Sequence, residues 1–120
     1  MSAELAIAAP LLLLMLLLIV QAAIWTHATN VAKTAATQGL AATRVHTGTA
    51  AEGATRTRDV LANLGNGPLD NPRVNVVRTT ERATVEVNGT AAAVIPFLRL
   101  PVHATAVGPV ERFVPDRAEP

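Results

Sequence analysis

Residues 5–25 read LAIAAPLLLLMLLLIVQAAIW, and this stretch holds no charged residue. A helix over it would be about 30 Å long, which matches the thickness of the hydrocarbon core of a membrane. The run from Leu11 to Val20 is apolar on every side, as a helix that faces lipid should be. Trp25 and His27 follow at the expected interface, a depth that tryptophan prefers. We therefore predict a transmembrane helix in residues 1–26.

Two other interpretations of this stretch are a cleaved secretory signal peptide and a buried core helix. The apolar run and the small pair Ala22-Ala23 would suit a signal peptide, but acidic Glu4 stands where a basic region is expected. A buried core helix would need a larger domain than 120 residues provide. Within the span, Pro10 removes one backbone donor and should bend or loosen the helix near its start.

The composition limits what the rest of the chain can be. The formal net charge is +1, so there is no electrostatic case for binding nucleic acid. The chain has no cysteine, which excludes disulfides and thiolate metal sites. Once an anchor is subtracted, the remaining residues form one small domain with a thin core.

Small or apolar residues recur at spacings of three and four after the span, which predicts that the helix continues as an amphipathic stalk from His27 to about His46. This small-residue stripe permits close approach of another helix. It could meet a neighbouring subunit or this chain's own sheet. We expect the first near the membrane, where the sheet should not reach, and the second farther out. The residues chosen as assembly candidates are Ala28, Ala32, Ala35 and Gly39.

The remaining residues predict a short helix and three strands. Thr47-Gly48 should break the first helix, and Thr49 with Glu52 has capping-box spacing for a second helix that stops at Gly65. A loop should occupy residues 66–72. Strands are expected over 73–79, 83–88 and 102–107, with a turn at 80–82 and an apolar flap over 90–101.

These elements predict an α+β fold: a long N-terminal helix, a second short helix and a three-stranded antiparallel sheet. The expected organisation is a span over 1–26, a stalk helix and small domain over 27–114, and a disordered tail over 115–120. Asn88-Gly89-Thr90 fits a glycosylation acceptor, but Asn-Gly is more simply a turn, which we prefer.

The N-terminal residues SAELAIAAPLLLL, in which Glu4 and Pro10 precede a leucine run, resemble the start of TadE-like proteins. Residues 31–44, VAKTAATQGLAATR, look like the alanine-rich continuation of that helix. Residues 106–113, AVGPVERF, resemble the C-terminal end of actinobacterial members. The resemblance extends over nearly the whole chain.

The resemblance implies a pilin-like fold and a minor pilin-like subunit of a tight-adherence (Tad, Flp-type) pilus. Its implied partners are the membrane, sibling pilin-like subunits, pilus assembly proteins and a prepilin peptidase, which cuts a short leader at the cytoplasmic face. This chain departs from that pattern because Met1 precedes Ser2 where a glycine is expected, and no basic leader precedes it. A truncated sequence, a misassigned start or an unprocessed member would each explain the difference.

Orientation is set by two opposing arguments. Lys33 and Arg44, the nearest basic residues, follow the span, so the positive-inside rule favours an N-terminus outside the cytoplasm. The resemblance implies the reverse, with the C-terminal part extracytoplasmic, and we adopt that topology for a single-pass membrane protein.

Glu4 carries the sharpest functional hypothesis. By the resemblance it would pair with the N-terminal amine of a neighbouring subunit. The alternative is a glutamate that favours the helix dipole and lies among lipid headgroups. His27, His46 and His103 lie in different elements without metal-ligand spacing, and the sequence has no catalytic motif. We therefore expect no metal, no cofactor and no enzyme. The alternative to a pilus subunit is a membrane-tethered binding module.

Overall fold

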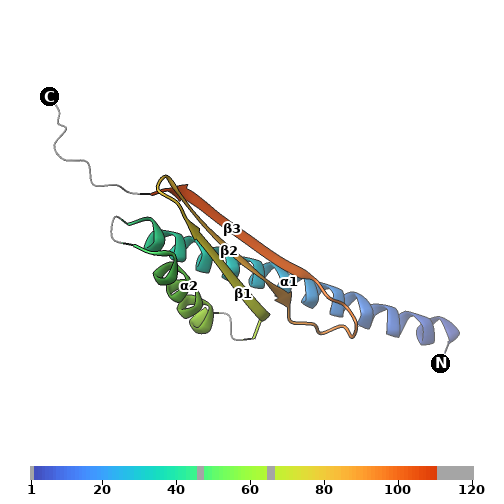
Figure 1. Ribbon diagram of the computed structural model, residues 1–120. Coiled ribbons are helices and arrows are strands. Elements are labelled where there is room, and N and C mark those ends of the chain that lie inside the picture. Colours follow the sequence, from blue (N-terminus) through green and yellow to red (C-terminus); the bar gives the residue numbers. More distant parts are fainter. Residues whose placement is uncertain (1, 46–47, 65–66, 111–120) are drawn as a thin grey trace.

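The computed structural model describes residues 2–45, 48–64 and 67–110. Its elements follow in the order α1 (Ala3–Arg44), α2 (Ala50–Leu64), β1 (Leu69–Arg78), β2 (Arg82–Ala91) and β3 (Pro101–Pro109). The predicted α+β class is confirmed, with a long helix, a short helix and an antiparallel three-stranded sheet. The N-terminal half of α1 projects well beyond the sheet (Figure 1).

Helix α1 joins the predicted span and the predicted stalk without a break. It has 42 residues, which corresponds to a length of about 63 Å. The Ser2 hydroxyl caps it by accepting a hydrogen bond from the Leu5 backbone N–H at 3.3 Å. The helix continues through Pro10 and ends at Arg44, close to the predicted end. One rigid element therefore links the apolar segment to the domain.

The capping box of α2 is confirmed. The Thr49 hydroxyl accepts from the Glu52 backbone N–H, and the Glu52 carboxylate accepts from the Thr49 N–H, both at 3.0 Å. The helix ends at Leu64, as predicted; the stop residue, Gly65, lies outside the described residues.

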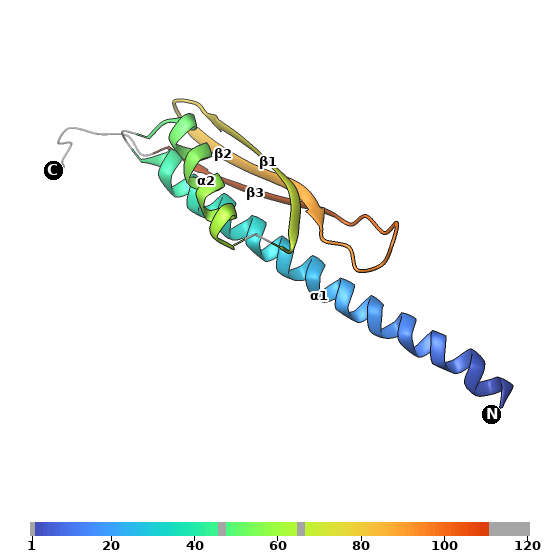
Figure 2. The ribbon, with the colours of Figure 1, turned by 90° about the horizontal axis from the view of Figure 1, so that it is seen from below.

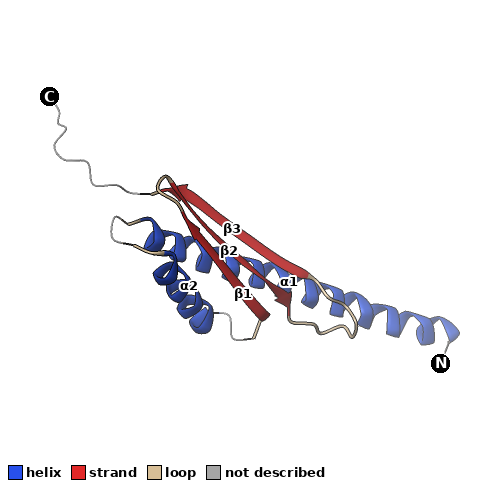
Figure 3. Ribbon diagram, viewed as in Figure 1, coloured by secondary structure: helices blue, strands red, loops and turns tan. Residues whose placement is uncertain are grey.

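The sheet has the order β1-β2-β3, so β2 is the central strand (Figure 3). Ala83, Val85 and Val87 of β2 are fully buried, and the residues between them are not, which confirms the predicted alternation. The turn between β1 and β2 is closed by Thr79, whose backbone N–H donates to the Arg82 carbonyl at 2.8 Å.

Two predictions of irregular chain are wrong, because residues 69–72 of the expected loop and the expected Asn88-Gly89 turn belong to strands. Leu69 and Asp70 pair with Ala91 and Thr90, so β1 begins within the expected 66–72 loop. The Asp-Asn-Pro turn signal survives only as a register shift between Asp70 and Arg73, with a φ of 50° at Asn71.

The second wrong prediction is the Asn88-Gly89 turn. Both residues lie inside β2 and pair with His103 and Val102 of β3. A Cβ on Gly89 would lie 2.8 Å from Leu69 Cδ1 and 3.0 Å from the Asp70 carbonyl oxygen. Gly89 therefore makes room for the buried Leu69 side chain on the neighbouring strand, and this packing, rather than a turn, accounts for the glycine.

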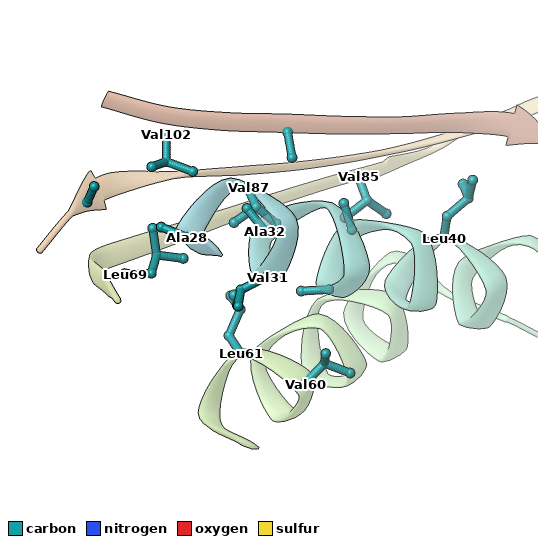
Figure 4. Close-up of a cluster of buried hydrophobic side chains, with 14 of the residues drawn as sticks. Ala28, Val31, Ala32, Leu40, Val60, Leu61, Leu69, Val85, Val87 and Val102 are labelled. Atoms are coloured by element: carbon teal, nitrogen blue, oxygen red, sulfur yellow. The ribbon is translucent and has the colours of Figure 1, made fainter. Parts of the chain in front are cut away.

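The core lies where the second half of α1 meets the sheet on one side and α2 on another (Figures 2 and 4). Its side chains are mostly alanine and valine, which is the thin core that the composition predicted. In Figure 4, Val31 of α1 lies beside Leu61 of α2, whereas Ala32 lies toward Val87 of the sheet. The C-terminal end of α1 is held by Arg78, whose guanidinium donates to the Thr43 and Val45 carbonyls at 2.8 and 3.2 Å.

The two helices touch through a reciprocal glycine–threonine contact. A Cβ built on Gly39 would overlap the Thr57 hydroxyl, and one on Gly53 would overlap the Thr43 hydroxyl. Each hydroxyl is turned back onto its own helix: Thr43 donates to the Gly39 carbonyl and Thr57 to the Gly53 carbonyl, both at 2.7 Å. The glycines let the helices approach, and the threonines fill the space without an unpaired buried hydroxyl.

We predict that Gly53→Ala destabilises the protein, although alanine is the better helix former. At an exposed helix position the change would stabilise by about 1 kcal/mol. Here the new methyl group meets Thr43, and overpacking should lower the free energy of unfolding by about 1–3 kcal/mol. Thermal unfolding of the full chain in detergent, followed by circular dichroism, measures the difference.

Thr43→Ala in the Gly53→Ala background is the control, because it removes the atoms that the new methyl group meets. The double variant should recover part of the loss relative to the sum of the single changes. Strict additivity would show that the two residues do not share this contact.

Candidate assembly and membrane interface

The N-terminal half of α1 presents an apolar surface that nothing in the described part of the chain covers. From Leu5 to Val20 every residue is exposed except Leu17, which is half-buried. Among the described residues, one helix is long and apolar enough to cross a membrane, and it is α1. Because this segment is exposed, it is not the core helix of a soluble domain, and it fits a single-pass membrane anchor.

Glu4 and Pro10 lie on this exposed segment. Glu4 is in the first turn of α1, where a carboxylate interacts favourably with the helix dipole. Pro10 is exposed within the helix. Neither residue touches the domain core. Their expected assembly role stays a prediction, and their position leaves both residues open to a neighbouring molecule.

The small-residue stripe packs against other parts of the chain than expected. Ala28, Ala32 and Ala35 are 0% exposed and belong to the core cluster of the chain itself. Gly39 is buried against α2. The expectation that the sheet would not reach Ala28 and Ala32 is wrong, because β2 and β3 extend farther toward the span than predicted. The close approach that the stripe permits is therefore made within the chain.

Gln21 is a polar residue whose contacts the sequence patterns did not predict. It lies in the uncharged segment, yet its side chain is only 2% exposed. Its amide nitrogen donates to the Ala92 carbonyl at 3.0 Å. Its amide oxygen accepts from the Val94 and Ile95 backbone N–H groups at 2.8 and 3.4 Å. One side chain thus ties the loop between β2 and β3 to the apolar helix, and a lone amide inside the span was the signal for it.

Trp25 adds a second tie one turn along the helix. Its indole N–H donates to the Pro101 carbonyl at 3.0 Å, at the start of β3. The predicted flap is present as the loop of residues 92–100, which we call the β2–β3 loop. Figures 1 and 2 both show it extending past the ends of the strands toward the N-terminal half of α1.

These ties favour an anchor over a cleaved signal peptide. The helix is continuous through Ala22-Ala23, the small pair that a signal peptidase would need. Cleavage there would separate Gln21 from the loop that its side chain holds, and would leave the Ala92 carbonyl and the Val94 N–H without this partner.

The described residues hold no group of three or more His, Asp or Glu side chains placed to bind a metal ion. His103 lies on the outer face of the sheet, where its ring contacts the Asn88 and Thr105 side chains at 2.6 and 2.9 Å. His27 is exposed on α1, and His46 lies outside the described residues. The same Asn88 that fits a glycosylation acceptor is therefore engaged with a neighbouring strand.

The fold and its exposed surfaces define a class: a membrane protein whose single long helix is an apolar anchor at one end and the core of a small α+β domain at the other. A family model described as TadE-like protein matches residues 1–40. The match covers the N-terminal third of the chain, which is less than the expected resemblance over nearly its whole length, and over this part the chain is similar to TadE-like proteins of Tad pilus systems. That family is a structural, pilus-associated one. No curated protein and no solved structure matches the chain.

We predict that Gln21→Met, which keeps the side-chain length but removes the amide, loosens the β2–β3 loop. The Ala92 carbonyl and the Val94 N–H would lose their partner, at a cost of about 1–3 kcal/mol. Hydrogen exchange of the Val94 and Ile95 amides should become faster by about tenfold or more. Ala22→Met, at the adjacent exposed position, is the matched control and should leave both rates unchanged. Equal exchange in the two variants would contradict the tie.

Proposed function

We propose that the protein is a minor pilin-like structural subunit of a Tad, Flp-type pilus or a related secretion filament. The observation that carries the proposal is the TadE-like match over residues 1–40, which includes the whole exposed apolar half of α1. An anchor that also forms the core of its domain transmits position from the membrane to the domain without a flexible joint. Such rigidity suits a subunit that is stacked on others through its helix.

The subunit contact would be made by the span. Because the stripe from Ala28 to Gly39 is covered by the chain's own sheet and α2, it has no surface left for a second helix. The side chains over residues 5–20 leave a surface free for a second helix, and this surface lies next to Glu4. In lipid, helices associate by close packing and by pairing of polar groups, so a carboxylate at the edge of the span would contribute strongly to a contact.

Glu4 would pair with the N-terminal amine of a neighbouring subunit, in keeping with the family. The partners would be sibling pilin-like subunits and pilus assembly proteins, together with a prepilin peptidase if a leader is made. The domain that follows the span would lie outside the cytoplasm.

We predict that Glu4→Gln and Glu4→Ala insert into the membrane normally but enter the assembly less well. Removing a charge eases insertion, so poor anchoring cannot explain a loss. Losing the pair should reduce the amount of the protein that co-purifies with its sibling subunits by about tenfold, equivalent to about 1.4 kcal/mol. Crosslinking in membranes, followed by co-purification, measures it.

Ser2→Ala is the matched control, because it removes the hydroxyl that caps the same turn and keeps the carboxylate. It should assemble as the wild type does. If both Glu4 variants also co-purify as the wild type does, the pairing role is refuted, and a membrane-tethered binding module becomes the better description.

We predict that the domain faces the outside of the cell. The chain has no cysteine, so a single Thr80→Cys change in the exposed β1–β2 turn gives a unique label site. In intact cells this cysteine should react with a membrane-impermeant maleimide as fully as it does after the cells are lysed. Reaction only after lysis would place the domain in the cytoplasm, as the basic residues Lys33 and Arg44 alone would suggest.

A further inference from the structure

The β2–β3 loop exposes an aromatic side chain without cover from the described chain. Phe97 is 102% exposed, and its φ of 68° lies in the left-handed region that non-glycine residues rarely occupy. Val94, in the same loop, is 39% exposed. Holding a phenylalanine fully in water, in an unfavourable backbone conformation, has a cost that an apolar partner would offset.

The place of the loop indicates which partner that is. A helix that enters the hydrocarbon at Leu5 reaches the opposite interface after about 20 residues, which is near Ile24 and Trp25. Gln21 lies one turn below Trp25, at a depth of about 6 Å along the helix. The loop backbone at residues 92–95 is bound to Gln21, so the loop tip lies level with the outer layer of the bilayer that α1 spans.

The hydrogen bonding of the loop backbone also suits that layer. Backbone groups that leave water must be paired, and irregular backbone is tolerated at such a depth only when it is. Gln21 pairs the Ala92 carbonyl and the Val94 and Ile95 N–H groups. Further along, the Leu98 N–H donates to the Ile95 carbonyl at 3.2 Å.

Basic side chains follow where lipid phosphates would lie. Arg99 comes two residues after Phe97, and it lines an open cleft together with Arg73 of β1. The adjoining cleft is lined by Arg99, Phe97 and Asp70. Arginine binds phosphate oxygens through two parallel hydrogen bonds, so an arginine pair at the headgroup level favours an anionic lipid surface.

We propose that the β2–β3 loop is a second membrane contact, which places Phe97 and Val94 in the interfacial layer of the bilayer that holds α1, with Arg99 and Arg73 at the headgroups. Together with α1 this contact sets how the domain sits on the membrane surface, because two attachments remove the rotation that one helix leaves free. The contact requires that α1 spans the bilayer and is independent of any role in a pilus.

The test uses the full chain in lipid nanodiscs at one chain per disc, in phosphatidylcholine with and without phosphatidylglycerol. A fluorophore on Pro96→Cys, beside an intact Phe97, should be quenched by spin-labelled lipids with a shallow label and protected from iodide in the water. A fluorophore on Val77→Cys, half exposed on β1 away from the loop, is the matched control and should show neither effect. Equal behaviour at the two sites overturns the proposal.

Three further variants in the Pro96→Cys background test the side chains. Phe97→Asp should reduce quenching at least about twofold, since a carboxylate is expelled from the interface, whereas Phe97→Leu should retain it. Arg99→Gln should reduce the additional quenching gained with phosphatidylglycerol. If Phe97→Asp changes nothing, the loop does not insert and the proposal fails.

The remaining alternative for the loop is a contact with a second copy. Protection of the Pro96 label that arises only when several chains share a disc would assign Phe97 to a subunit interface and overturn the membrane contact. A label on Leu14→Cys, inside the span, reports the anchor separately. Deep quenching at Leu14 without quenching at Pro96 would thus refute the loop contact alone and leave the proposed pilus role untouched.

Discussion

The close approach that alanine and glycine allow on the second half of α1 is the interaction on which the rest of the structure depends. The sheet lies against one side of this segment, and α2 crosses another side at Gly39 and Gly53. With larger side chains on α1, a three-stranded sheet and a 15-residue helix could not both reach it. The core is thin in consequence, and shape complementarity rather than the volume of large side chains holds it together.

In this arrangement one half of α1 is suited to lipid and the other half is packed within the protein. From Leu5 to Val20 its side chains are apolar and, except for the half-buried Leu17, exposed, as lipid requires, and from Ala28 onward one face is covered by protein. Between these regions lie Gln21 and Trp25, whose polar atoms bind the β2–β3 loop and the start of β3. The transition is therefore built from hydrogen bonds to the helix rather than from a flexible linker, and the domain is fixed to the anchor at its base as well as along its length.

The division of surfaces bears on how such a subunit could function. The stripe that looks suited to meeting a neighbour is covered by the chain's own sheet and α2, whereas the span, the first turn with Glu4 and the loop that carries Phe97 are exposed. These surfaces all lie toward the membrane end of the molecule. The outer face of the sheet is mainly polar, with the His103 ring bound to the Asn88 and Thr105 side chains, and the clefts of the domain are open.

The sequence by itself determined the features that depend on near neighbours in the chain. An uncharged apolar run predicts a span, Thr49 and Glu52 predict a capped helix start, and the alternation around Val85 predicts a half-buried strand. Each of these rests on spacing within a few residues. The capped start and the half-buried strand are confirmed, and the apolar run forms an exposed helix that is long enough to cross a membrane. Glu4 was singled out from its place before the span, and its role in an assembly stays a prediction, since one chain alone does not test it.

Only the tertiary structure decided what distant residues do to one another. Asn88-Gly89 is a strong local turn signal, yet the buried Leu69 side chain across the sheet needs the space that Gly89 leaves, and the strand runs on. No local pattern accounts for Gly53; its place is explained by Thr43 of α1, which packs against it. Gln21 reads as an isolated polar residue until the loop seventy-one residues away supplies its partner. In each case the energy lies in a contact whose second member cannot be identified from local spacing, so the pattern of one segment could not reveal it.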